Sequence, residues 1–373
     1  MDKIHKFIEC LVPVTACNLK CEYCYIIYQN RRKGEIGPFN YSPERIGQAL
    51  NKERLGGIAY ISMCGAGETL LPKEMPKIIE EVLKQGHYVN ITTNGTISQR
   101  FDEIIKLPKE LLERLHFAFS FHYLELLKTN NLDIFFNNVK KVREAGCSFL
   151  IQLNLYDNYV PHLEEIKKIC YEKVGAYPQL AATRSEYLDR KKTKYKLYTQ
   201  KDEKEYKEIG DSFDSKLFDF TIKNFNVKRK EFCYAGDWSF LLNLGTGNIS
   251  KCYLEPIIQN IFENVNESIK FGAIGNFCRY EYCVNSSHFM SLGIIPSVDT
   301  PSYAELRNRS EASWYTEKME AFLSTKLTDT NKEYCVLKKI NTNVNRSISI
   351  LLRKGNNKIK NVKKQFKNKK FNQ

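Results

Sequence analysis

The chain contains no run of about 18 consecutive apolar residues, the length that a membrane-spanning helix needs. Its first residues also lack the apolar core of a secretory signal peptide. These two absences exclude a helical membrane protein and favour a cytoplasmic location. Because disulfides are rare in that reducing compartment, the 12 cysteines are expected to be metal ligands, catalytic thiols or small core residues.

Acidic residues are missing from one long segment of the chain. Residues 346–373 carry ten Lys or Arg and no Asp or Glu, so the other 345 residues contribute only +4 to the net charge of +14. This segment is also low in apolar residues, and we therefore expect a basic, disordered tail. A tail that binds RNA or a membrane surface is the alternative, but nucleic acid is not the expected partner of the protein as a whole.

Strand-like and helix-like patterns alternate over the first half of the chain. Short segments rich in Ile, Val, Phe, Tyr and Leu predict six strands, at Phe7–Val14, Ile58–Met63, Tyr88–Thr92, His116–Phe121, Ser148–Leu155 and Gln179–Thr183. Helical spacing predicts helices between and after them, beginning at Pro43 and covering Pro72–Lys84, Phe101–Glu113, Asp133–Ala145, His162–Lys173 and Lys201–Ile209. This order predicts an α/β fold with a parallel sheet, whose functional residues lie at the carboxyl ends of the strands.

A compact set of cysteines follows the first predicted strand. Cys17, Cys21 and Cys24 form a C-x3-C-x2-C pattern on one short loop. Three thiolates can hold three irons of a [4Fe–4S] cluster and leave the fourth iron open to a small ligand. A structural zinc site would need a fourth ligand nearby, and chance clustering of core cysteines is the remaining alternative.

The cysteine pattern, with Tyr23 before its last cysteine, resembles the C-x3-C-x-aromatic-C signature of the radical S-adenosylmethionine (SAM) superfamily. The resemblance covers residues from about Phe7 to Thr183. It implies a partial (β/α)6 TIM-type barrel, a [4Fe–4S] cluster on the three cysteines, and SAM bound to the open iron. It also implies reductive cleavage of SAM to a 5′-deoxyadenosyl radical, with an electron donor such as flavodoxin or ferredoxin as a partner.

The same resemblance implies a set of SAM-contacting residues. Gly65-Ala66-Gly67-Glu68-Thr69 is similar to the family's G-G-E-P motif, although it departs from it, and Glu68 can accept a hydrogen bond from an ammonium group. Thr93-Asn94-Gly95 resembles another family motif. The predicted cofactor-binding residues are Tyr23, Gly65, Gly67, Glu68, Asn94, Ser120, His122 and Asn154.

A second cysteine set lies in the C-terminal half of the chain, at Cys233, Cys252, Cys278 and Cys283. Thirteen residues separate Cys233 from Gly247, which begins a G-x4-C pattern ending at Cys252. This resembles the opening of the SPASM and twitch modules, which carry auxiliary iron–sulfur clusters. Four cysteines suit one auxiliary [4Fe–4S] cluster, with two clusters, zinc or core cysteines as alternatives.

These patterns predict three regions: a radical SAM core over residues 1–210, a SPASM- or twitch-like module over 211–345, and the basic tail over 346–373. The predicted function is oxidation of a sugar, cyclitol or glycan-type alcohol. Peptide or protein maturation is the second hypothesis, and a non-catalytic iron–sulfur or nucleic-acid-binding protein is the third. No residue is predicted as the general base. The other cysteines, including Cys64 and Cys335, are predicted to be small core residues.

Overall fold

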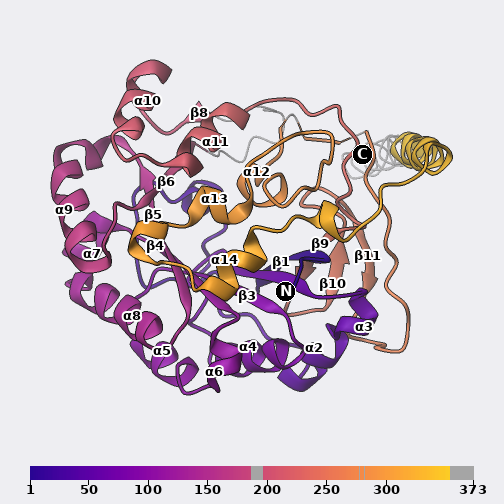
Figure 1. Cartoon of the computed structure of the whole chain (residues 1–373), viewed down its shortest axis with the longest axis horizontal. Coiled ribbons are helices and arrows are strands. Elements are labelled where there is room, and N and C mark those ends of the chain that lie inside the picture. Colours follow the sequence, from indigo (N-terminus) through magenta and orange to yellow (C-terminus); the bar gives the residue numbers. More distant parts are fainter. Residues whose placement is uncertain (186–195, 277, 281, 353–373) are drawn as a thin grey trace, which may run out of the picture.

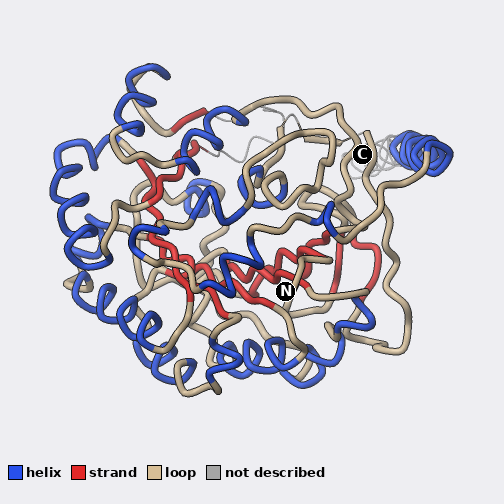
Figure 2. Tube along the Cα trace, viewed as in Figure 1, coloured by secondary structure: helices blue, strands red, loops and turns tan. Residues whose placement is uncertain are grey.

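The computed structural model describes residues 1–185, 196–276, 278–280 and 282–352. A nine-stranded sheet runs through the molecule in the order β11-β10-β9-β1-β2-β3-β4-β5-β6 (Figures 1 and 2). Its strands are β1 (Lys6–Val12), β2 (Ala59–Gly65), β3 (Tyr88–Thr93), β4 (Leu115–Ser120), β5 (Ser148–Leu155), β6 (Gln179–Ala182), β9 (Ser239–Asn243), β10 (Asn248–Ser250) and β11 (Ile257–Asn260). Strands β1 to β6 are parallel neighbours in chain order.

Helices connect the parallel strands, as parallel pairing requires. In chain order, the numbered helices are α1 (Tyr25–Tyr28), α2 (Pro43–Ala49), α3 (Lys52–Leu55), α4 (Met75–Lys84), α5 (Ser98–Ile104), α6 (Lys109–Leu112), α7 (Tyr123–Lys128), α8 (Leu132–Glu144), α9 (Leu163–Val174), α10 (Glu203–Asp211), α11 (Lys216–Asn224), α12 (Ser286–Phe289), α13 (Tyr303–Arg307) and α14 (Glu317–Leu323). Figure 1 shows α2, α4, α5, α8 and α9 following one another around the outer side of the sheet. The predicted α/β class and the partial (β/α)6 barrel are confirmed.

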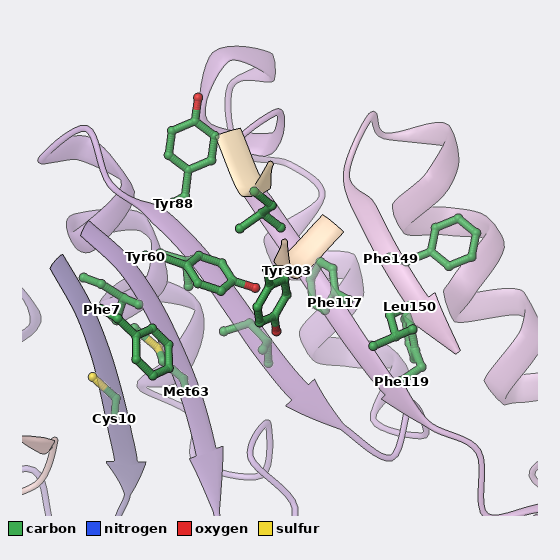
Figure 3. Close-up of a cluster of buried hydrophobic side chains, with 14 of the residues drawn as sticks. Phe7, Cys10, Tyr60, Met63, Tyr88, Phe117, Phe119, Phe149, Leu150 and Tyr303 are labelled. Carbon is green, nitrogen blue, oxygen red and sulfur yellow. The ribbon is translucent and has the colours of Figure 1, made fainter. Parts of the chain in front are cut away.

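The sheet is buried because its strands are apolar on both faces, as strands covered on both sides must be. On one face Phe7, Tyr60 and Tyr303 meet, with ring centroids 6.1 Å apart for Phe7–Tyr60 and 5.2 Å for Tyr60–Tyr303 (Figure 3). Tyr88 stacks on Phe322 at 3.6 Å. Since Tyr303 and Phe322 lie on α13 and α14, the C-terminal half of the chain supplies part of the cover of the first strands.

The part of the chain that carries the second cysteine set adds β9, β10 and β11 to the same sheet. β9 pairs with β1 in parallel, and β10 pairs antiparallel with both β9 and β11. β9 and β10 form a hairpin whose turn contains Gly245 and Gly247. Its attachment to β1 brings residues after 233 next to the strand that leads into the first cysteine loop.

The helices differ from the expected ones in two segments. The helix expected over Phe101–Glu113 is two helices, α5 and α6, because Pro108 cannot continue a helix from α5. Residues 213–227, for which no helix is predicted, contain α11, whose N-cap Ser215 accepts a hydrogen bond from the backbone of Phe218.

Residues 336–352 form one helix. The first part of the segment expected to be a disordered tail, residues 346–352, is therefore helical. The rest of the expected tail lies outside the described residues. Cys335, expected in the core, is exposed. Within the part of the chain that the structure describes, no helix is long and apolar enough to cross a bilayer.

Candidate active site

One cavity of about 370 Å³ opens at the carboxyl ends of the parallel strands. All three cysteines of the first set line it, together with Cys283 of the second set. It is also lined by all eight residues predicted to contact SAM, namely Tyr23, Gly65, Gly67, Glu68, Asn94, Ser120, His122 and Asn154. The structure thus brings together residues from the ends of five strands, whereas their role in binding SAM stays a prediction.

The first cysteine loop runs from the end of β1 to Cys24, which precedes α1. Cys21 is buried, and Cys17 and Cys24 are half-buried. Burial and, to a lesser extent, the neighbouring Cys17 and Cys24 raise the pKa of the Cys21 thiol. Three thiols packed so close together disfavour the thiolate form unless a cation neutralises them, so the loop suits a metal cluster.

Polar contacts from other elements hold this loop in place. The guanidinium of Arg32 donates to the carbonyl oxygen of Cys17 at 2.8 Å and to that of Leu19. The Asn94 amide donates to the Cys17 sulfur at 3.8 Å and to the Asn18 side chain at 2.8 Å. Hydrogen bonds to a ligating sulfur orient the ligand and tune the metal. Asn94 is therefore placed to act on the cysteine loop as well as on a ligand in the cavity.

The glycines after β2 are required by packing against the cysteine loop. A Cβ at Gly67 would come within 1.8 Å of the Ala16 carbonyl oxygen, and one at Gly65 within 2.4 Å of Val14. The Glu68 N–H donates to the same Ala16 carbonyl at 2.8 Å. The two glycines therefore allow the loops after β1 and β2 to touch, in addition to any approach of a ligand.

Glu68 is a buried carboxylate with one acceptor position left. Its Oε1 accepts from the Leu70 N–H at 2.9 Å and from the Thr93 hydroxyl at 2.7 Å, and its Oε2 accepts from the Asn94 N–H at 2.7 Å. Each carboxylate oxygen has two lone pairs, so Oε2 can accept one further bond. Burial raises the pKa of Glu68, and these bonds offset part of that rise. A ligand ammonium group in the cavity would suit the remaining position.

Tyr23 and His122 form a buried polar pair in the cavity wall. The Tyr23 hydroxyl lies 2.6 Å from His122 Nδ1 and 3.2 Å from the Tyr159 hydroxyl. Burial lowers the pKa of His122 to about 4, so its imidazole is neutral at pH 7. A Tyr23 hydroxyl that donates to Nδ1 leaves the imidazole proton on Nε2. This pair then offers the cavity an N–H donor and no charge.

Comparison with known proteins identifies the part of the chain that carries these loops. Residues 11–169 match the family model of the Radical SAM superfamily. This part of the chain is similar to radical SAM domains, and the match covers less than half of the chain. It begins near the end of β1 and contains β2 to β5 and every residue of the first cysteine loop.

Single relatives resemble the chain more distantly. A probable GTP 3′,8-cyclase of Pyrobaculum aerophilum is 31% identical over 85 residues, which is 23% of this chain and 26% of that protein. The crystal structure of Streptococcus suis SuiB bound to S-adenosylmethionine aligns with a TM-score of 0.48 at 15% identity, over 70% of this chain and 64% of SuiB. The structure of anSMEcpe with bound AdoMet aligns with a TM-score of 0.45 at 16% identity, over 70% of this chain and 78% of anSMEcpe. The chain thus spans about a quarter of the curated relative and under two thirds of SuiB.

The four cysteines of the second set gather close to one another. Burial raises the pKa of Cys252 well above its ordinary value, and Cys283, Cys233 and Cys278 raise it further, so the four thiols lie close to one another. Cys233 also forms a two-way backbone bridge with Gly275. Among the described residues no group of three or more Cys, His, Asp or Glu side chains surrounds a position for a single metal ion.

Sequence reasoning missed two parts of the site. Arg32 lies in a charged loop that matches no recognisable motif. Nothing in the sequence therefore predicted its contact with the cysteine loop. Glu9 lies within β1, where a polar residue in an alternating strand pattern does not indicate a functional role. Its Oε1 accepts from the Cys64 thiol at 3.2 Å and its Oε2 lies 3.4 Å from the Asn285 amide. Asn285 in turn lies 3.4 Å from the Tyr253 hydroxyl.

Glu9 therefore connects β1 and β2 with the two segments that follow Cys252 and Cys283. Burial raises the pKa of Glu9 to about 7, and hydrogen bonds from Cys64, Tyr253 and Asn285 offset part of that rise. The folded state favours the protonated carboxyl. The contribution of this protonated carboxyl to the free energy of unfolding is complete below pH 4.5 and is lost as the pH rises through about 7.

We predict that Glu9→Gln raises the stability of the protein more at pH 8 than at pH 5. The upper bound of the difference is on the order of 3 kcal/mol, because each unit of pKa corresponds to about 1.4 kcal/mol. The melting temperature of the variant and the unmodified protein, measured at both pH values, tests this. Glu164→Gln is the control, since Glu164 is a surface carboxylate that is 88% exposed. A Glu9→Gln effect of equal size at pH 5 and pH 8 would contradict the prediction.

Proposed function

We propose that this protein is a radical SAM enzyme that oxidises a hydroxyl-bearing substrate of the sugar, cyclitol or glycan type. The observation that carries the proposal is that one cavity touches both cysteine sets, through Cys17, Cys21 and Cys24 on one side and Cys283 on another. A substrate in this cavity would have access to the chemistry of both sets at once.

The cofactors supply the reactive chemistry, and the protein binds and orients them. A [4Fe–4S] cluster on Cys17, Cys21 and Cys24, with SAM bound, supplies hydrogen-atom abstraction by a 5′-deoxyadenosyl radical. Glu68 Oε2 would accept a hydrogen bond from the SAM ammonium group, and Asn94 would orient both Cys17 and the neighbouring loop. Arg32 would hold the cysteine loop through its backbone carbonyls.

The second cysteine set supports an oxidation rather than a redox-neutral rearrangement. Conversion of an alcohol to a carbonyl removes one hydrogen atom, one proton and one electron. Four cysteines on one auxiliary cluster would leave no iron open to bind substrate, and such a closed cluster would supply an electron acceptor. Because Cys283 lines the cavity, this acceptor would lie next to the substrate.

The remaining lining of the cavity suits a substrate rich in hydroxyl groups. Neutral side chains that donate or accept hydrogen bonds line it outside the residues predicted to contact SAM, including Gln152, Thr183, Asn285 and Ser287. A site of this kind recognises hydroxyl groups well, because a substrate lacking them would leave buried polar groups without partners. This composition favours an alcohol substrate over an apolar one.

Anaerobic turnover tests the proposal in two stages. SAM and a reductant, dithionite or a flavodoxin, are expected to yield 5′-deoxyadenosine and methionine. A panel of cyclitols, sugars and peptides is then screened for a product two hydrogens lighter, with one 5′-deoxyadenosine formed per product. A product of unchanged mass, or SAM regenerated after each turnover, would rule out oxidation. Loss of two hydrogens from a peptide would favour peptide maturation, and no SAM cleavage would favour a non-catalytic protein.

A further inference from the structure

The helix over residues 336–352 presents an apolar face to solvent. Leu337, Ile340, Val344, Ile348 and Leu351 recur every three or four residues, which places them on one side of the helix. We call these five residues the apolar stripe. Their exposed fractions lie between 50% and 78%. This helix carries seven of the 18 exposed large apolar side chains of the described chain, so the exposure is concentrated here.

Polar contacts on the opposite side hold the helix in this orientation. Arg346 forms two hydrogen bonds of 2.5 Å with the carboxylate of Glu255, and both side chains are buried. Asn343 exchanges hydrogen bonds with Asn276, at 3.0 Å to its backbone N–H and 2.7 Å to its side chain. The Lys338 ammonium lies 3.7 Å above the Tyr334 ring.

This arrangement is the reverse of the usual one. A helix on a globular protein normally buries its apolar face and exposes its polar face. Here buried polar contacts attach the polar face to the body, and Figure 1 shows the helix in yellow at the edge of the molecule. An exposed apolar face of this extent marks an interaction surface.

The charge of the adjoining sequence indicates what covers this surface. Residues 336–373 contain 12 Lys or Arg and no Asp or Glu, so an anionic partner fits the charge of this segment. A second copy of the chain would bring two such segments together and be repelled. RNA would use the positive charge but not the apolar stripe. An anionic lipid bilayer uses both, because its phosphates attract Lys and Arg while its acyl region accepts apolar side chains.

We propose that the helix over residues 336–352 attaches this protein to anionic lipid surfaces, with the apolar stripe inserted at the headgroup boundary. The helix lies in the plane of the interface and does not span the bilayer. The polar contacts of Arg346 and Asn343 then set the orientation of the protein body on the surface.

Vesicle sedimentation of the full-length protein tests the proposal. The protein is expected to sediment with vesicles of phosphatidylglycerol mixed with phosphatidylcholine and to stay in solution with phosphatidylcholine alone. Ile340→Gln, Val344→Gln and Ile348→Gln together should lower the partition coefficient at least about tenfold, because three apolar side chains lose their burial. Deletion of Arg353–Gln373 should weaken binding and reduce its dependence on salt. SAM cleavage should stay unchanged in both variants.

Leu127→Gln with Ile134→Gln is the matched control, since these apolar side chains are 41% and 37% exposed on α7 and α8, at the other end of the molecule from the helix (Figure 1). This control should bind vesicles like the unmodified protein. A second readout uses Ile348→Trp, whose emission should shift to shorter wavelength on anionic vesicles. Equal binding to both vesicle types, full binding by the triple variant, or no emission shift would overturn the proposal. So would a dimer that the triple variant dissociates, or binding of single-stranded RNA alone.

Discussion

Replacement of Cys17, Cys21 and Cys24 by Ala is expected to abolish SAM cleavage and to remove about half of the iron. The unmodified protein should hold about eight iron atoms per chain after anaerobic reconstitution, as two [4Fe–4S] clusters require. The three thiols lie on one loop that the Arg32 guanidinium and the Asn94 amide hold against the cavity. Their loss removes every predicted protein ligand of the SAM-binding cluster, so cleavage should fall below detection.

Iron analysis, the visible absorption of the reconstituted protein and 5′-deoxyadenosine formation measure this effect. Cys147→Ala with Cys335→Ala is the control, because Cys147 is a buried residue and Cys335 an exposed one outside both sets. The control should keep all its iron and its SAM cleavage. Retention of full iron by the triple variant would show that these cysteines are not the ligands.

The second large effect concerns the other cysteine set. Cys252→Ala together with Cys283→Ala should remove about half of the iron, leave SAM cleavage largely intact and abolish formation of the oxidised product. Cys252 lies close to the other three thiols, and Cys283 also lines the cavity. Their loss therefore affects the expected electron acceptor without touching the first cysteine loop.

Iron content, electron paramagnetic resonance of the reduced protein and product analysis separate the two sets. The double variant should lose one of two cluster signals while still producing 5′-deoxyadenosine. Zinc in the unmodified protein at one atom per chain, with only about four irons, would contradict the auxiliary cluster. Loss of SAM cleavage in the double variant would show that the second set supports the first site structurally.

Local patterns predicted the strands well because each strand is short, apolar and ended by a polar or glycine residue. β5 has the predicted bounds, and the start of β3 at Tyr88 is also as predicted. Predictions failed where one residue or a distant contact decided the outcome. Pro108 divided the helix expected after Phe101 into α5 and α6. The Ser215 cap and packing against β6 stabilise α11 in a segment for which no helix was predicted.

Residue types and spacing alone determined much of this protein: an α/β order, a three-cysteine loop after the first strand, and candidate contacts at the ends of the following strands. These are properties of neighbouring residues, and neighbours in sequence are neighbours in space. Only the tertiary structure decided how distant segments meet. β9 pairs with β1, and Cys283 lines the same cavity as the first cysteine set. Burial raises the pKa of Glu9, so its carboxyl group favours the protonated form. The contact of Arg346 with Glu255, 91 residues apart in the chain, holds the polar side of the helix against the body and leaves the apolar stripe exposed.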